Sequence, residues 1–168
     1  MNIFLTGFMG CGKSTIGELL ASRLQWSFYD LDAQIETGMG KTVREIFTTV
    51  GETEFREREK LLLREITQKS RTVISLGGGT LLNRENIEVV KKSGILIWLN
   101  APLGVLRKRL GNEDVRPLLD GVDSLEYLYR NRIAGYENAQ LEIDASGNNP
   151  GLIVDGIINK MKYEGIGF

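Results

Sequence analysis

The stretch GFMGCGKSTIG, residues 7–17, decides how the rest of the chain is interpreted. Within it, Gly7, Gly12, Lys13 and Ser14 match the spacing G-x-x-x-x-G-K-[ST] without a mismatch. A loop of this composition directs several backbone N–H groups at one anion, because glycine permits the tight turns and the close approach that this requires. The lysine reaches the terminal phosphates of a nucleotide, and the following hydroxyl binds Mg²⁺. The stretch therefore predicts a nucleotide-phosphate site.

The residues on either side of this loop support that prediction. Residues 2–7, NIFLTG, are typical of a buried strand, and residues 13–24 carry apolar side chains at helical spacing. A glycine-rich turn between a strand and a helix can also reflect tight packing alone, and 20 glycines in 168 residues make a chance match less rare. The preceding strand and the following helix favour the phosphate loop, whose expected contacts come from Gly10, Cys11, Gly12, Lys13, Ser14 and Thr15.

Composition narrows the class of protein. A length of 168 residues fits one domain with a substantial core, and a net charge of −1 argues against a general nucleic-acid binder. No apolar run reaches membrane-spanning length, and the N-terminus lacks the basic region of a signal peptide. A single cysteine fits a reducing compartment, so we expect a cytoplasmic location. The absence of histidine excludes histidine-based catalysis and histidine metal ligands.

Short β-type runs alternate with amphipathic stretches, which predicts a layered α/β fold with right-handed crossovers. We expect strands at residues 2–6, 27–31, 72–76, 95–99 and 141–144, and helices over 13–24, 53–69, 84–93 and 151–162. Residues 33–52 predict a small helical excursion between two glycine-containing turns. Residues 109–124 have little periodicity, and we interpret this long connection as a lid. No repeat or linker divides the chain, so residues 1–168 are expected to form one domain.

Two carboxylates follow the second expected strand, in the run YDLD. If Asp30 and Asp32 both lie on that strand, their side chains point the same way. Ligands of open α/β sheets sit outside the carboxyl ends of the strands, where two carboxylates can assist Mg²⁺ and hold or deprotonate a hydroxyl. The alternative is that one carboxylate caps the next helix and the other is solvated.

The third expected strand runs into GGGT, residues 77–80. Three consecutive glycines exceed what a plain tight turn needs, so we interpret Gly77, Gly78 and Gly79 as a place where substrate approaches the backbone closely. A loose loop is the alternative.

Arginines supply the remaining signal, because the planar guanidinium suits carboxylate and phosphate. Arg56 lies in FREREKLLL, and Arg132 lies one helical turn before Tyr136. Taken singly, each of these arginines fits a solvated surface residue better than a functional one. Arg116, which precedes a proline in the expected lid, is the better candidate to meet a transferring phosphate when the lid closes. Cys11 is either a reactive thiol at a helix N-terminus or simply a small side chain, and we favour the second interpretation.

Taken together, these stretches resemble the shikimate kinase family over nearly the whole chain. The phosphate loop, DLD, FREREKL (the family's F-R-x-x-E), GGG, RPLL and RIAGY occur in the family's order and near its spacing. The resemblance implies a three-layer α/β/α fold with a five-stranded parallel sheet, of the P-loop kinase type, with a mobile lid. It also implies ATP-dependent phosphorylation of the 3-hydroxyl of shikimate on the route to chorismate, by a monomer that uses Mg²⁺ with ATP as co-substrate.

The resemblance also assigns roles to individual residues. Lys13 would neutralise charge on the transferring phosphoryl group, Ser14 would hold Mg²⁺, and Asp30 would act on the metal through water. Asp32 would bind shikimate hydroxyls and orient or deprotonate the attacking one. On the acceptor side, the resemblance implies that Arg56 and Arg132 clamp the substrate carboxylate. Backbone N–H groups around Gly78 and Gly79, with Gly77 beside them, would complete the pocket, together with a substrate-binding helical segment over about 33–62. On the nucleotide side, Arg116 would enter from the lid over about 109–124, and Arg109 would lie against adenine.

Two departures from the family pattern concern the nucleotide. The segment 143–151 carries Gly147 and Asn148 where many members have arginines, and Cys11 replaces a commoner alanine. A related small kinase acting on gluconate or a nucleoside monophosphate stays an alternative. A GTPase switch is disfavoured by the lack of an [NT]-K-x-D motif, and a degenerate nucleotide-binding module is disfavoured because the lysine, hydroxyl, carboxylates and lid arginine are all present.

Overall fold

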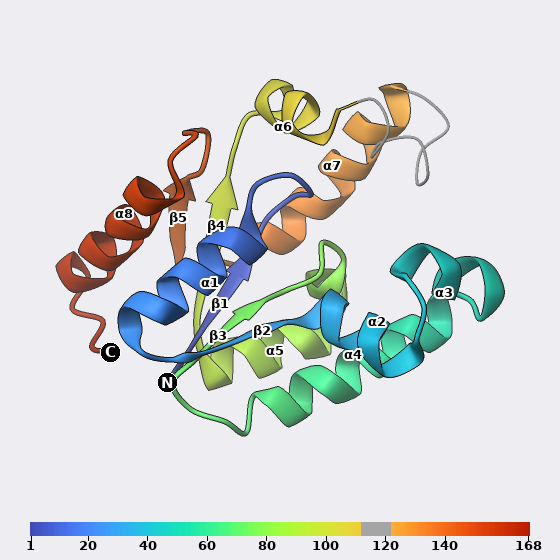
Figure 1. Cartoon of the computed structure of the whole chain (residues 1–168), viewed down its shortest axis with the longest axis horizontal. Helices are drawn as coiled ribbons and strands as arrows, with labels where there is room; N and C mark the ends of the chain where they lie inside the picture. Colours follow the sequence, from blue (N-terminus) through green and yellow to red (C-terminus); the bar gives the residue numbers. More distant parts are fainter. Residues whose placement is uncertain (112–121) are drawn as a thin grey trace.

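Five parallel strands form one sheet in the order β2-β3-β1-β4-β5, in a computed structural model that describes residues 1–111 and 122–168 (Figure 1). The strands are β1 (Asn2–Thr6), β2 (Ser27–Asp30), β3 (Thr72–Ser75), β4 (Gly94–Asn100) and β5 (Leu141–Asp144). The helices are α1 (Lys13–Leu24), α2 (Leu31–Met39), α3 (Val43–Thr49), α4 (Glu52–Ile66), the 3-10 turn η1 (Thr80–Leu82), α5 (Arg84–Ser93), α6 (Leu103–Leu110), α7 (Val122–Tyr136) and α8 (Pro150–Tyr163).

Helices cover both faces of the sheet, which gives the predicted three layers. Ile3 of β1 pairs with Val73 and Ile95 of its neighbours, and these side chains belong to a core shared with α1 and α8. The next residue, Phe4, faces the opposite side and packs in a second core with α4 and α5. The central strands are apolar on both faces for this reason, as expected of a parallel sheet between two helical layers.

Local sequence explains where several helices begin and end. Gly12, with a φ of 93°, precedes α1, and Gln25, in the left-handed region at a φ of 56°, ends it. Thr42 and Glu45 form a reciprocal capping box at the start of α3. Asn149 caps α8, whose first residue is Pro150. The predicted helical excursion over 33–52 is confirmed as α2 and α3, and the other predicted helices agree with α1, α4, α5 and α8 within a few residues.

One local prediction was wrong. Asp30 and Asp32 do not both lie on a strand, because the side chain of Asp30 accepts a hydrogen bond from the Ala33 N–H (3.2 Å) and so caps α2. The chain turns into the helix at Leu31, and Asp32 stands in the first helical turn. The capping alternative therefore applies to Asp30, while Asp32 is directed to the carboxyl end of the sheet by the helix.

All five strands end at the same edge of the sheet. The phosphate loop follows β1, Asp30 ends β2, the GGG turn follows β3, and residues 145–149 follow β5. This is the edge at which open α/β sheets bind ligands. In the described residues, no helix combines the length and apolarity needed to cross a membrane.

Candidate active site

The phosphate loop has the backbone geometry that its glycines predict. Gly7, Gly10 and Gly12 adopt φ values of 147°, 78° and 93°, which side-chain-bearing residues rarely adopt. A Cβ on Gly7 would lie 2.6 Å from the carbonyl oxygen of Leu99 on β4, so the loop also needs glycine in order to pack against the sheet. Lys13 curls over the loop and donates to the carbonyl oxygen of Gly7 at 2.9 Å.

Cys11 is buried beneath the same loop. Its exposed fraction is 1%, and its sulfur would lie 2.8 Å from a Cβ on Gly7. The sulfur is 4.0 Å from Nζ of Lys13. A small side chain is therefore required at this position, in agreement with the packing interpretation of the cysteine.

Ser14 and Asp30 meet at the start of α1. The Ser14 hydroxyl donates to Oδ2 of Asp30 at 2.5 Å, and this hydrogen bond is exposed to solvent. A hydroxyl and a carboxylate oxygen are hard donors of the kind that Mg²⁺ prefers, and protein sites for Mg²⁺ beside nucleotides use only one or two such groups. Within residues 1–111 and 122–168, no cluster of three or more His, Cys, Asp or Glu side chains is placed to hold a metal ion. The pair thus fits a metal that is held largely by phosphate and water. Thr15, the next residue of α1, is exposed.

Asp32 is the most perturbed acid of the site. Its pKa is raised from 3.8 to about 6, first by burial and then by the negative charges of Glu59 and Asp30, while the positive charges of Lys13 and Arg56 act in the opposite direction. A carboxylate with such a pKa, next to a phosphate loop, is suited to accept a proton or a hydrogen bond from a substrate hydroxyl near neutral pH.

Arg56 is held on α4 by two glutamates. Its Nη1 donates to Oε2 of Glu59 at 3.0 Å, and its Nε and Nη2 donate to Oε1 of Glu52 at 3.1 and 3.0 Å. The guanidinium also lies over the rings of Phe47 and Phe55, at 5.8 and 5.2 Å from their centroids. These contacts direct the arginine toward the carboxyl edge of the sheet instead of solvent.

Arg132 reaches the same place from α7. Its guanidinium lies 5.6 Å from the ring centroid of Phe8, and its buried Nε has no hydrogen-bond partner in the part of the chain that the structure describes. Tyr136, one turn later, is buried and donates to the carbonyl oxygen of Gly78 at 3.1 Å. Burial raises the pKa of this tyrosine well above its usual range, so it stays a donor. RIAGY therefore supplies one charged group and one fixed hydroxyl.

The GGG turn is shaped by side chains of the protein itself. A Cβ on Gly77 would lie 2.5 Å from Oδ1 of Asp32, one on Gly78 would lie 2.5 Å from Nη1 of Arg132, and one on Gly79 would lie 2.5 Å from Nη2 of Arg56. The groups that lie against these glycines are side chains of the protein, and close approach of substrate to this backbone stays a prediction. The N–H groups of Gly78 and Gly79 have no acceptor among the described residues.

These groups line one pocket of about 320 Å³. Lys13, Asp32, Arg56, Arg132 and the three glycines all contribute to its wall. The remaining lining is apolar and comes from Met9, Val43, Phe47, Phe55 and Leu110. The pocket therefore combines a phosphate loop, one acid with a raised pKa and two arginines in a space suited to a small anionic molecule.

Arg109 has partners other than the expected ones. From α6 it donates to the carbonyl oxygens of Ala145 and Ser146 at 2.9 Å and of Gly147 at 2.8 Å, and it reaches Gly10 of the phosphate loop at 3.5 Å. It therefore ties the loop after β5 to the phosphate loop. Whether it also faces a nucleotide base stays a prediction.

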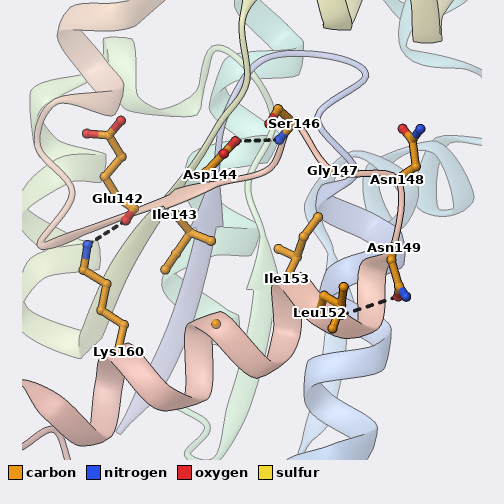
Figure 2. Close-up of a pocket in the computed structure, with 11 residues that line it drawn as sticks. Glu142, Ile143, Asp144, Ser146, Gly147, Asn148, Asn149, Leu152, Ile153 and Lys160 are labelled. Carbon is orange, nitrogen blue, oxygen red and sulfur yellow. Dashed lines mark hydrogen bonds between the residues drawn. The ribbon is translucent and has the colours of Figure 1, made fainter.

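A larger hollow lies beside that loop, between β5 and α8, and has a volume of about 540 Å³ (Figure 2). Its polar groups are already engaged with one another: Lys160 donates to the carbonyl oxygen of Glu142 at 2.9 Å, and Asp144 accepts from the Ser146 N–H at 2.8 Å. Lys160 thereby covers part of the edge strand, a common protection against further strand pairing. The smaller pocket, where the charges converge, is the candidate active site.

Two expectations fall partly or wholly outside the described residues. Arg116 and most of the lid predicted over 109–124 lie there, while Arg109 and Leu110 end α6 and residues 122–124 begin α7. The substrate-binding segment predicted over 33–62 corresponds to α2, α3 and most of α4.

Glu59 is the buried residue beside the site that sequence reasoning did not single out. It is 1% exposed, bonds to Arg56 and acts on the pKa of Asp32. Its signal was present, because it is the glutamate of F-R-x-x-E, three residues after Arg56 and hence on the same helix face.

Comparisons with known proteins identify the family. The sequence model of the family described as "Shikimate kinase" matches residues 9–162. The shikimate kinase of Microcystis aeruginosa is 44% identical over 94% of this chain and 85% of its own length, and that of a Sulfurihydrogenibium species is 38% identical over 96% and 98%. The structure of the shikimate kinase of Acinetobacter baumannii in complex with shikimate aligns with a TM-score of 0.90 and 33% identity, covering 97% of this chain and 93% of that one. The chain belongs to the shikimate kinase family.

Proposed function

We propose that this protein transfers the γ-phosphoryl group of ATP to the 3-hydroxyl of shikimate. The observation that carries the proposal is the single pocket lined by Lys13, Asp32, Arg56 and Arg132 at the carboxyl edge of the sheet. Family membership supports the same reaction. An acceptor with both hydroxyls and a carboxylate explains why the pocket contains an acid on one element and two arginines on others.

The phosphate end of the site positions the nucleotide. Lys13 leaves the carbonyl oxygen of Gly7 and neutralises charge on the transferring group, as lysines of such loops do. Ser14 would hold Mg²⁺ and Asp30 would act on it through water. Their side-chain oxygens lie 2.5 Å apart, so both are near enough to act on one metal ion. When bound, the metal would supply neutralisation of the phosphate charge. The loop amides around Gly10, Cys11, Gly12 and Thr15 would bind the remaining phosphate oxygens.

The acceptor end activates and orients the hydroxyl. Asp32, with a pKa raised to about 6, is ionised at neutral pH and close enough to that pH to take a proton during transfer. Arg56 and Arg132 bind the carboxylate, and the N–H groups of Gly78 and Gly79, which have no acceptor in the described part of the chain, add donors beside them. Phosphoryl transfer requires little covalent chemistry from the protein, so positioning and charge supply most of the catalysis.

Arg116 and Arg109 complete the proposed nucleotide contacts. Arg116 would approach the transferring phosphoryl group from the lid, where a cation stabilises the charge of the transition state. Arg109 would hold the nucleotide side of the site through the loop that it already binds.

The test is ADP release from Mg·ATP with shikimate, gluconate or AMP as acceptor. We expect stimulation by shikimate alone. Stimulation by gluconate or AMP would favour the related small kinases. Tight ATP binding without stimulation by any acceptor would support the phosphate site but contradict shikimate as the substrate. Omission of Mg²⁺, or chelation with EDTA, should abolish turnover.

We also infer a cytoplasmic monomer. The single, buried cysteine fits a reducing compartment. Gel filtration at micromolar concentration should give one species of 18.8 kDa, and a species of twice that mass would contradict the monomer.

A further inference from the structure

A chain of buried polar groups runs from α5 through the GGG turn to α4. Asn86, Thr80 and Glu59 are 2%, 0% and 1% exposed. The Asn86 side chain donates to the carbonyl oxygen of Thr80 at 3.0 Å, and the Thr80 hydroxyl donates to Oε1 of Glu59 at 2.6 Å. The other carboxylate oxygen of Glu59 accepts from Arg56 at 3.0 Å. Buried polar side chains linked in this way hold one another in a single arrangement.

The hydrogen bond from the Thr80 hydroxyl orients the Glu59 carboxylate. A carboxylate that accepts one hydrogen bond at each oxygen has its plane fixed by the two donors, and Thr80 and Arg56 are those donors within the described residues. Glu52, the second partner of Arg56, has a side chain that is 62% exposed. An exposed pair of this kind contributes little and moves easily, so the buried Glu59 is the firmer anchor of the guanidinium.

The position of Thr80 is also coupled to the turn that carries the glycines. The Thr80 N–H donates to the carbonyl oxygen of Gly77 at 3.2 Å and closes the turn. A Cβ on Gly77 would meet Asp32, Glu59 and the Thr80 hydroxyl at 2.5, 2.9 and 3.1 Å, so these three groups surround one point. The same hydroxyl thus sets the spacing between the turn and α4.

We propose that Thr80 is a positioning residue for the acceptor: its hydroxyl fixes Glu59, and through Glu59 it holds the Arg56 guanidinium in the orientation that binds the substrate carboxylate. This inference rests on the proposed role of Arg56 in shikimate binding. Thr80 itself does not line the pocket, so it acts only through its neighbour.

The experiment compares Thr80→Val, which keeps the shape and removes the donor, with Thr80→Ser, which keeps the donor. Steady-state kinetics are measured against shikimate at saturating Mg·ATP and against ATP at saturating shikimate. Loss of a hydrogen bond to a buried charged group should raise KM for shikimate about tenfold in Thr80→Val, with KM for ATP changed by less than about twofold. Thr80→Ser should stay close to wild type.

Thr72→Val is the matched control. Thr72 is also buried, at 1% exposure, but it lies at the opposite end of β3 and its hydroxyl donates to the carbonyl oxygen of Ser70 at 3.2 Å. Both valine variants lose one hydrogen bond made by a buried threonine, so both are expected to lower Tm. Only the change at position 80 should raise KM for shikimate.

A double-mutant cycle with Arg56→Ala separates positioning from general damage. If Thr80 acts through Arg56, Thr80→Val should cause no further increase of KM in the Arg56→Ala background. The same increase in both backgrounds, or an unchanged KM in Thr80→Val, would overturn the proposal. If Thr80→Val does not fold, Thr80→Ala, which removes the hydroxyl and adds no atom beside Glu59, replaces it in both arms.

Failure of the two proposals can be told apart. A wild-type protein that does not phosphorylate shikimate contradicts the proposed function before any variant is made, and with it the role of Thr80. Normal turnover in the wild type combined with an unaffected Thr80→Val contradicts the role of Thr80 alone.

Discussion

Gly78 and Arg132 lie in direct contact: a methyl group on the glycine Cα would come within 2.5 Å of Nη1 of the arginine. The arginine comes from α7 and the glycine from the turn after β3, so this contact joins two distant parts of the chain at the pocket. The absence of a side chain at position 78 is therefore a condition for the position of the guanidinium.

Gly78→Ala should displace Arg132 and weaken binding of the acceptor. We expect KM for shikimate to rise about tenfold or more, because a charge-assisted hydrogen bond is lost or lengthened. KM for ATP should change little. The matched control is Gly156→Ala on α8, where no atom of the described residues lies within 4 Å of the added methyl group and alanine is the better helix former. Equal kinetics for both variants would contradict the packing argument.

Glu59→Gln should raise KM for shikimate more than Glu52→Gln. Both glutamates bind Arg56, but Glu59 is 1% exposed whereas the Glu52 side chain is 62% exposed. Removing the buried charge leaves the guanidinium without its firmest partner, which is expected to cost about tenfold in KM. An effect of the same size in Glu52→Gln would show that burial does not decide the anchoring. Isothermal titration with shikimate, in addition to kinetics, checks the result.

Asp32→Asn should remove turnover and stabilise the protein at high pH. The pKa of Asp32 is raised from 3.8 to about 6 by folding, so this group destabilises the folded state progressively as pH rises from about 4 to about 6, and by a constant amount above. The difference corresponds to about 3 kcal/mol at most, or several degrees in Tm for a chain of this size. We expect the variant to melt higher than wild type at pH 8 and at nearly the same temperature at pH 4.

The suitable measurement is thermal unfolding in magnesium-free buffer with EDTA and no nucleotide, because bound nucleotide or metal would itself shift Tm. A difference in Tm between Asp32→Asn and wild type that is the same at pH 4 and pH 8 would contradict the raised pKa. Retained turnover in the folded variant would separately contradict the catalytic role.

Thr6→Val should increase the free energy of unfolding. Thr6 is fully buried at the end of β1, and its hydroxyl has no hydrogen-bond partner among the described residues. Burying a hydroxyl without a partner costs about 1–3 kcal/mol, and valine has the same shape without that cost. Urea unfolding should give a higher midpoint with an unchanged slope. A lower midpoint would reveal a partner for the hydroxyl.

Arg109→Ala should weaken the binding of ATP and leave the binding of shikimate unchanged. Arg109 bonds to three carbonyl oxygens of the loop after β5, and its loss leaves that loop without its link to the phosphate loop. We expect KM for ATP to rise several-fold, by about 1 kcal/mol of binding energy, with KM for shikimate unchanged. The neighbouring Lys108→Ala, an exposed residue of the same helix, is the control and should leave both constants as they are.

Sequence reasoning was most reliable where a pattern is local. The spacing of Gly7, Gly12, Lys13 and Ser14 identified the phosphate loop, because its chemistry depends on consecutive backbone groups. Nearly continuous apolar runs identified β3 and β4, because strands buried on both faces carry apolar side chains on both. The edge strands β2 and β5 are partly exposed and were predicted from shorter β-type runs. The error at Asp30 and Asp32 was also local: a cap and a strand end look alike in sequence, and the hydrogen bond to Ala33 decides between them.

What only the tertiary structure decided is which dispersed residues meet. Arg56 and Arg132 are 76 positions apart in the numbering and looked like surface residues when taken singly. The GGG turn packs between them because parallel strands end at one edge of the sheet and α4 and α7 both reach that edge. The spacing of Arg56 and Glu59 places them on one helix face, but the contact that holds Glu59 could not be read from sequence, since its partner Thr80 is 21 positions away. Spacing along the chain specifies a backbone cradle, whereas a side-chain clamp exists only once the sheet has brought its parts together.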